Sequence, residues 1–377
     1  MRKMSGRFSA VAGMTALMGL LLVAASVPAQ AQTYRVLHSF TGGTDGSGPV
    51  GDLIRDTAGN LYGTTESGGN ANCRSGCGTI FKLDIRGESV LYSFTGPYTD
   101  GEGPQAGLVR DAAGNLYGTT AAGGNSGLGT VFKVDATGKE TVLYNFTGTP
   151  DGSDPVDGLV RDSVGNLYGT TYGGGDYVCQ CGTVFKIDPT GKETVLYSFI
   201  GGTDGANPGA GLVHDASGKE TVLYRFNGSA DGGGPQASLI VDAAGDLYGT
   251  ASYGGSTPSC GTVFKVDGSG TQTVLYSFTC GTDGGAPSNG LVMDPAGNLY
   301  GTASLYGDLS CRQLGSLCGT VFELSTAGTL SVLHIFTGGA DGGWPLAGLV
   351  RDPVGNLYGT TLLGGALNNG VVFGIKP

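Results

Sequence analysis

The sequence predicts an all-β fold, a β-propeller built from four-stranded antiparallel blades. Three observations lead to this prediction: a repeat of roughly 52 residues, four short strand patterns in each full repeat, and a last repeat that lacks one strand. Glycine, at 74 of 377 residues, follows this long period and does not recur at every third position, which excludes collagen. The charged fraction of 14% and the hydrophobic fraction of 39% exclude a disordered chain.

A phenylalanine that ends a VLYSF-like string marks the period. It stands at Phe40, Phe94, Phe146, Phe199, Phe226, Phe278 and Phe336. The step from Phe199 to Phe226 is about half as long as the others, so one repeat is shortened.

The repeat that begins at Gly158 shows the four strands expected in a blade. Patterns rich in Val, Leu, Tyr, Phe and Thr occupy residues 158–162, 167–171, 183–188 and 194–199. Gly165 and Gly191 lie in the short polar links within each strand pair, where a tight hairpin needs positive φ. The strands are apolar on both faces, which favours a sheet packed between two neighbouring sheets.

The two ends of the chain predict closure of a ring. The last repeat supplies only three strand patterns, at 348–352, 357–361 and 371–375. The missing fourth pattern stands at 34–40. An N-terminal strand that completes the C-terminal blade removes both free sheet edges.

The shortened repeat joins a first-strand pattern at 211–218 directly to a fourth-strand pattern at 219–226. The middle strand pair is missing. We therefore predict six complete blades plus one truncated two-stranded repeat, and the ring symmetry stays open between six and seven sectors.

The repeat strings GNLYGTT, GTVFKVD and TVLYSF resemble the Gloeo–Verruco (GloVer) tandem repeats of bacterial exported proteins. The resemblance covers essentially all of the chain after its N-terminal segment. It implies a repeat architecture on an exported protein, often followed by a C-terminal anchoring segment, and it implies no particular activity or functional residue. Here the C-terminus holds no apolar span of about 20 residues.

The N-terminal segment is predicted to be a signal peptide covering residues 1–31. Arg2, Lys3 and Arg7 precede an apolar run, and Ala29 and Ala31 fit a cleavage site, with the cut after Ala31. The mature chain, 32–377, is then a single repeat domain that is secreted or periplasmic, has no transmembrane anchor and is expected to be a monomer. The net charge of −11 argues against nucleic-acid binding.

The eight cysteines fall within individual repeats. We predict disulfides in an oxidising compartment, because a metal site needs clustered thiolates and these pairs belong to different blades without histidine partners. The predicted pairs are Cys73–Cys77, Cys179–Cys181, Cys260–Cys280 and Cys311–Cys318, with the second pair left open.

Each repeat also carries an aspartate in a D-G-x-x-P loop: Asp45, Asp100, Asp151, Asp204, Asp231, Asp283 and Asp341. Recurrence in every repeat favours turn caps over a ring of ligand-binding carboxylates. One loop departs from the pattern, because Asp151, Asp154 and Asp157 lie together in it. Carboxylate oxygens suit Ca²⁺, so this loop is the candidate metal site.

Aromatic side chains in the loops of one face are candidate ligand contacts. They are Trp344, Tyr172, Tyr177, Tyr253 and Tyr306. The alternative is that they pack over the blade tops.

No catalytic residue is predicted, because no Ser-His-Asp set and no G-x-S-x-G string occurs. We expect a secreted non-catalytic propeller whose loop face binds polysaccharide, a surface protein or another cell-surface component. One alternative is a structural or adhesive envelope protein. A second is a carbohydrate-active hydrolase or lyase, for which the sequence nominates no carboxylate pair.

Overall fold

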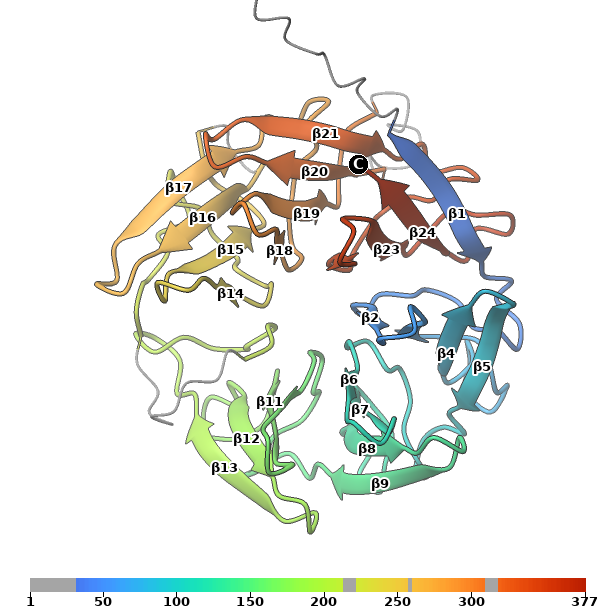
Figure 1. Ribbon diagram of the computed structural model, residues 1–377. Coiled ribbons are helices and arrows are strands. Elements are labelled where there is room, and N and C mark those ends of the chain that lie inside the picture. The colour runs from blue at the N-terminus through green and yellow to red at the C-terminus, as the bar shows by residue number, and fades with distance from the viewer. Residues whose placement is uncertain (1–31, 213–221, 257–259, 309–317) are drawn as a thin grey trace, which may run out of the picture. The chain divides into compact units, whose positions relative to one another are not determined.

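A computed structural model describes residues 32–212, 222–256, 260–308 and 318–377. The predicted signal peptide, residues 1–31, lies outside the described residues. The described residues form six four-stranded antiparallel sheets arranged as the blades of a ring (Figure 1). This confirms the predicted all-β propeller.

The blades follow one another along the chain, each from the inner to the outer strand. Blade 1 contains β2 (Ile54–Arg55), β3 (Leu61–Thr65), β4 (Thr79–Asp84) and β5 (Gly87–Ser93), and blade 2 contains β6 (Val109–Arg110), β7 (Leu116–Thr120), β8 (Thr130–Val134) and β9 (Glu140–Asn145). Blade 3 contains β10 (Val160–Arg161), β11 (Leu167–Thr171), β12 (Thr183–Ile187) and β13 (Glu193–Ser198), and blade 4 contains β14 (Ile240–Val241), β15 (Leu247–Ala251), β16 (Thr262–Val266) and β17 (Gln272–Ser277). Blade 5 contains β18 (Val292–Met293), β19 (Leu299–Ala303), β20 (Thr320–Leu324) and β21 (Leu330–Ile335), and blade 6 contains β22 (Val350–Arg351), β23 (Leu357–Thr361), β24 (Val371–Lys376) and β1 (Thr33–Ser39).

The N-terminal strand closes the ring. β1 pairs antiparallel with β24, with Thr33 opposite Lys376 and Ser39 opposite Val371. Figure 1 shows β1 at the outer edge of the sheet that β22, β23 and β24 begin. The predicted exchange of the outer strand is therefore confirmed.

The core lies between the blades. The phenylalanine after five of the six outer strands meets the third-strand phenylalanine of the next blade edge to face, as Phe94 meets Phe132 at 5.1 Å between ring centroids. Both rings are fully buried, and burying such a side chain contributes about 1.5–3 kcal/mol. Gly63 of β3 makes room for this layer, because a Cβ there would lie 2.7 Å from the Phe81 ring.

The described residues of the shortened repeat pack against blade 4 but form no assigned strand. Residues 213–221 lie outside the described residues, and residues 222–226 form no assigned strand. The predicted truncated two-stranded repeat is therefore not shown, and the described sheets make six blades. Phe226 nevertheless packs on Phe264 of blade 4 with ring centroids 4.8 Å apart.

The inner hairpins explain the recurrent D-x-x-G-N-L-Y string. In blade 1, Asp56 accepts hydrogen bonds from the Asn60 backbone and side chain and from the Tyr62 hydroxyl. Burial alone would raise the pKa of Asp56, but these hydrogen bonds outweigh it and lower the pKa. In blade 4, Asp246 replaces the asparagine, and Lys265 pairs with it at 2.5 Å.

Candidate functional site

The loops that enter the six blades meet at the centre of the ring and line an axial pocket of about 520 Å³. Lining residues come from the loop before every blade and, at Gly209, from the shortened repeat. The polar lining side chains include Asp52, Glu66, Gln105, Asp154, Asp157 and Tyr172. None of the described residues that line the pocket is Lys, Arg or His.

The repeat pattern breaks at the axis. The third residue after the loop proline is Asp52 in blade 1, whereas the equivalent residues are Gly107, Gly158, Gly211, Ser238, Gly290 and Gly348. The Gly348 N–H donates to Asp52 Oδ1 at 2.6 Å. A Cβ on Gly348 would lie 3.2 Å from both Asp52 carboxylate oxygens, so a small residue there leaves space for the carboxyl.

A second carboxyl breaks the pattern one position earlier. Asp157 takes the place of Gly51, Ala106, Ala210, Ala237, Asn289 and Ala347. Its Oδ1 accepts a hydrogen bond from the Gly158 N–H at 2.5 Å. The sequence places Asp52 and Asp157 far apart, and the ring brings both to one pocket.

The surroundings favour the protonated form of both carboxyls. Burial raises the pKa of Asp157 to about 7, the Gly158 N–H opposes this, and the charge of Asp52 adds to it. Asp52 is exposed because its side chain faces the open pocket. The protein around the pocket nevertheless shields the Asp52 carboxyl from bulk water, and this desolvation raises its pKa. The hydrogen bond from the Gly348 N–H opposes the shift. Burial also raises the pKa of Glu66 and of Asp154.

The three aspartates of the predicted calcium loop do not share one environment. Asp151 is buried and accepts hydrogen bonds from the Tyr144 hydroxyl at 2.7 Å and from the Thr147 hydroxyl at 2.7 Å. Asp154 and Asp157 instead line the axial pocket. In the described parts of the chain, no three His, Cys, Asp or Glu side chains group as a metal site.

The five aromatic side chains predicted to contact a ligand do not share one site either. Tyr172 is 47% exposed and lines the axial pocket. Tyr253 has the same exposed fraction, 47%, but its ring lies over Gly233, where an added Cβ would be 2.3 Å from it. Tyr306 lies in the same way over Gly285. Tyr177 is 79% exposed outside the pocket, and Trp344 is partly buried with φ of 54°.

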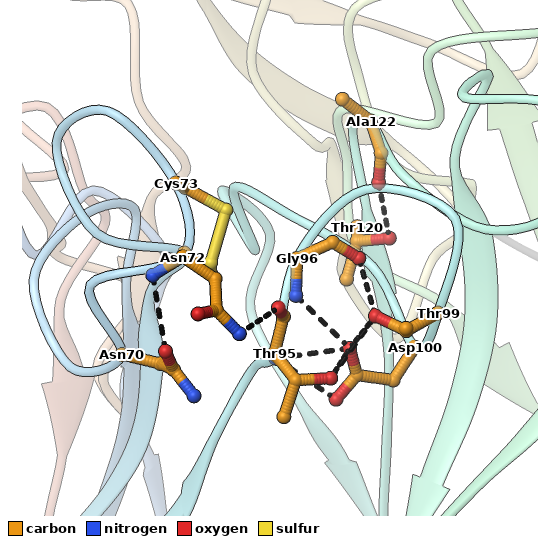
Figure 2. The surroundings of a disulfide bond; sticks show 10 residues. Asn70, Asn72, Cys73, Thr95, Gly96, Thr99, Asp100, Thr120 and Ala122 are labelled. Carbon is orange, nitrogen blue, oxygen red and sulfur yellow. Dashed lines mark hydrogen bonds between the residues drawn. A yellow bond between two sulfur atoms is a disulfide. The ribbon is translucent and has the colours of Figure 1, made fainter.

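The recurrent loop aspartates are held inside the scaffold. Figure 2 shows Asp100, which accepts hydrogen bonds from the Thr95 hydroxyl, the Gly96 N–H and the Thr99 hydroxyl. The Tyr92 hydroxyl of the preceding outer strand donates to its other oxygen. A Tyr or His pairs with the equivalent aspartate in every repeat. These contacts support the interpretation of the aspartates as loop caps.

The structure joins Cys73 to Cys77, Cys179 to Cys181, and Cys260 to Cys280. Cys318 is also disulfide-bonded, and its predicted partner, Cys311, lies outside the described residues. Disulfides fit an extracellular or periplasmic setting. None of the described residues forms a helix long and apolar enough to cross a membrane.

Sequence reasoning missed Asp52, Glu66 and Gln105 as pocket residues. The signal was present in the repeat itself, because Asp52 stands where most other repeats have glycine.

The fold and the pocket define a six-bladed β-propeller whose loops converge on an acidic axial pocket. The chain belongs to the Gloeobacter/Verrucomicrobia repeat family, which matches residues 23–219 and 213–377. This confirms the resemblance of the repeat strings to that family.

Solved structures with a similar fold include one described provisionally as a gluconolactonase, with 13% identity, a TM-score of 0.46 and 92% of each chain covered. Another is an oxidoreductase from Thermus thermophilus, described provisionally as a glucose dehydrogenase, with 15% identity and a TM-score of 0.47. That alignment covers 92% of this chain and 100% of the other. No curated protein matches the chain. Identity this low gives no information about activity.

Proposed function

We propose that the protein is exported and binds a saccharide in the axial pocket. The observation that carries this proposal is the break in repeat symmetry at one place: Asp52, Asp157 and Tyr172 all line the same cavity. A residue that only maintains the scaffold recurs from blade to blade, whereas a binding site needs a particular residue at a particular position.

The pocket has the chemistry that a polyhydroxylated ligand needs. Carboxylate oxygens accept hydrogen bonds from hydroxyl groups, and the Gln105 and Gln236 amides both donate and accept. The exposed Tyr172 ring offers an apolar face against which a sugar ring can lie. A cavity of about 520 Å³ falls within the usual range of ligand sites.

The charge of the pocket narrows the ligand class. Four carboxyl side chains line it, those of Asp52, Glu66, Asp154 and Asp157, and no cationic side chain does so among the described residues. Burial already makes a negative charge costly here, since it raises the pKa of all four carboxyls, and an anionic ligand would add a further charge to the same site. We therefore expect neutral or amino sugars to bind and uronic-acid polymers to be rejected.

Titration calorimetry of the mature protein with neutral, amino and uronic oligosaccharides tests the proposal. Tyr172→Ala should weaken binding about 10-fold or more, the loss expected for removing one stacking contact of about 1.4 kcal/mol. Tyr253→Ala is the matched control, because that ring has the same exposure but packs over Gly233 in the loop that enters blade 4. Absence of binding to every saccharide, with Ca²⁺ or with a chelator, would contradict the proposal and favour a structural or adhesive role.

A second candidate function is hydrolysis of the bound saccharide. The observation that favours it is the pKa of Asp157, about 7, beside the second carboxyl of Asp52. A protonated Asp157 can donate its proton to the glycosidic oxygen as that bond breaks. Because the two carboxyls interact, the loss of a proton from one holds the proton on the other, and with the proton on Asp157 the Asp52 carboxylate can take a proton from the water that attacks the anomeric carbon.

Release of reducing ends from bound oligosaccharides separates the two functions. Asp157→Asn should retain binding and lose turnover about 100-fold or more if Asp157 is the acid. A wild-type protein that binds oligosaccharides and releases no reducing ends would leave only the binding function.

Export is tested separately. N-terminal sequencing of protein from the periplasm or medium should begin at Gln32. Intact Met1 on the exported protein would contradict the predicted cut.

A further inference from the structure

The start of each outer strand faces the loop that enters the same blade. The strand register makes these positions equivalent, because each residue lies opposite the end of the third strand. The occupants differ between blades: Glu88, Glu140, Glu193, Gln272, Leu330 and Tyr34.

Two of these residues show what the position does. The Gln272 side-chain amide donates to the carbonyl oxygen of the loop residue Asp231 at 3.1 Å. The Tyr34 hydroxyl donates to the carbonyl oxygen of the equivalent residue Asp341. In blades 4 and 6 the position therefore holds a hydrogen-bond donor that ties the outer strand to its entering loop.

The three glutamates occupy the same position in blades 1, 2 and 3. Oε1 of Glu88, Glu140 and Glu193 is buried and finds no hydrogen-bond partner among the described residues. An ionised carboxylate can only accept hydrogen bonds, whereas a protonated one can donate as Gln272 and Tyr34 do. An ionised carboxylate with a buried, unpartnered oxygen beside the charge of the loop aspartate is the unfavourable state.

The charged neighbours act in the same direction. The negative charge of a loop aspartate disfavours ionisation of each glutamate: Asp45 for Glu88, Asp100 for Glu140 and Asp151 for Glu193. His38 Nε2 lies 3.4 Å from Asp45 Oδ2, and the Tyr92 hydroxyl donates a hydrogen bond to Asp100. Tyr144 bonds to Asp151. Burial first, and then the charge of the aspartate, raises the pKa of each glutamate to about 7.

We propose that Glu88, Glu140 and Glu193 are protonated latches, each donating a hydrogen bond from an outer strand to the loop aspartate carbonyl, and that the latches open when these carboxyls ionise. The folded state holds these protons above the pH at which the unfolded chain releases them. The free energy that the protonated glutamates add to folding is therefore fully present below the unfolded pKa of about 4.3. It is lost as pH rises through about 7.

The test compares the wild type with Glu88→Gln/Glu140→Gln/Glu193→Gln by thermal unfolding at pH 4 and pH 8. The variant carries at all three positions the amide that Gln272 already provides in blade 4. We expect similar Tm values at pH 4 and a Tm higher by about 3 °C or more for the variant at pH 8. Every other titrating group is common to both proteins, so its effect cancels. An equal difference at both pH values would overturn the proposal.

Two further measurements keep the test decisive if the triple variant does not fold. Gln272→Glu should introduce a new loss of stability between pH 5 and pH 8 relative to the wild type. In wild-type protein, NMR titration of the glutamate side-chain carbonyl carbons should give three midpoints near 7. Midpoints near the ordinary value of about 4.3 would overturn the proposal whatever the variants do.

Discussion

Blades 1–3 and blades 4–6 share one scaffold but differ in the residues that depart from it. Both halves have the same phenylalanine contacts between blades and the same loop aspartates. The axial carboxyls Asp52 and Asp157, the exposed Tyr172 and all three latch glutamates belong to blades 1–3. Blades 4–6 carry smaller or uncharged residues at the equivalent positions, such as Ser238 and Gln272. The contacts that stabilise the blades are thus present in both halves, whereas the axial carboxyls and the latch glutamates lie in blades 1–3.

The largest expected effect tests whether the scaffold is equivalent in the two halves. Phe132→Ala in blade 2 and Phe322→Ala in blade 5 each remove a fully buried ring. Each should lower the free energy of unfolding by about 3–5 kcal/mol in guanidinium titrations, and by similar amounts. A cost confined to one half would show that the blades do not contribute equally.

The disulfides should differ between the halves. Cys260–Cys280 in blade 4 closes a separation of 20 residues, whereas Cys73–Cys77 in blade 1 closes a separation of 4. Replacing both cysteines by alanine should cost about 3 kcal/mol in blade 4 and about 2 kcal/mol in blade 1, because a longer loop loses more entropy on closure. Denaturant unfolding of the two double variants measures this, and the reverse order would contradict the loop-entropy explanation.

Asp157→Asn makes blade 3 resemble blade 5, where Asn289 occupies the equivalent position. Asp157 has a native pKa of about 7, so it keeps its proton while the unfolded chain ionises from about pH 3.9. Wild-type stability therefore falls as pH rises between those values.

The asparagine variant should equal the wild type at pH 4 and exceed it by about 1 kcal/mol at pH 8, a figure reduced because the carboxyl borders the open pocket. Denaturant unfolding at the two pH values measures the difference. A pH-independent difference would mean that Asp157 acts through its shape and not through its proton.

The smallest effect concerns the inner hairpin of blade 4. Lys265→Ala breaks a partly exposed ion pair with Asp246, and because such pairs contribute little to stability, it should lower the Tm less than any replacement above. Asp246→Asn restores the asparagine found in the other blades and should make the lysine replacement nearly neutral. A double-mutant cycle of thermal unfolding measures the interaction between Lys265 and Asp246. Additive effects would show that Lys265 does not compensate for the aspartate.

The scaffold was predictable because it is encoded locally and repeatedly. The strand 167–171 was predicted with the bounds that the structure has, since its apolar residues and flanking glycines lie in one short string. The inner strand predicted at 158–162 is only Val160–Arg161, because the residues before it turn toward the axis and form no ladder.

The pocket was less predictable because it depends on closure of the whole ring. Asp154, Asp157 and Tyr172 were candidates from loop composition, yet nothing local brings Asp52 beside Asp157. Asp151 shows the opposite case. Its sequence neighbours suggested a metal loop, but the Tyr144 and Thr147 hydroxyls already occupy its carboxylate.

The pairing of Thr33 with Lys376 has a consequence for the order of folding. β1 leaves a ribosome or a translocon long before its partner β24 does. Contacts this distant in sequence contribute to slow folding, because chain entropy is lost before they form. Until β24 emerges, β1 is an unpaired sheet edge that other chains can join.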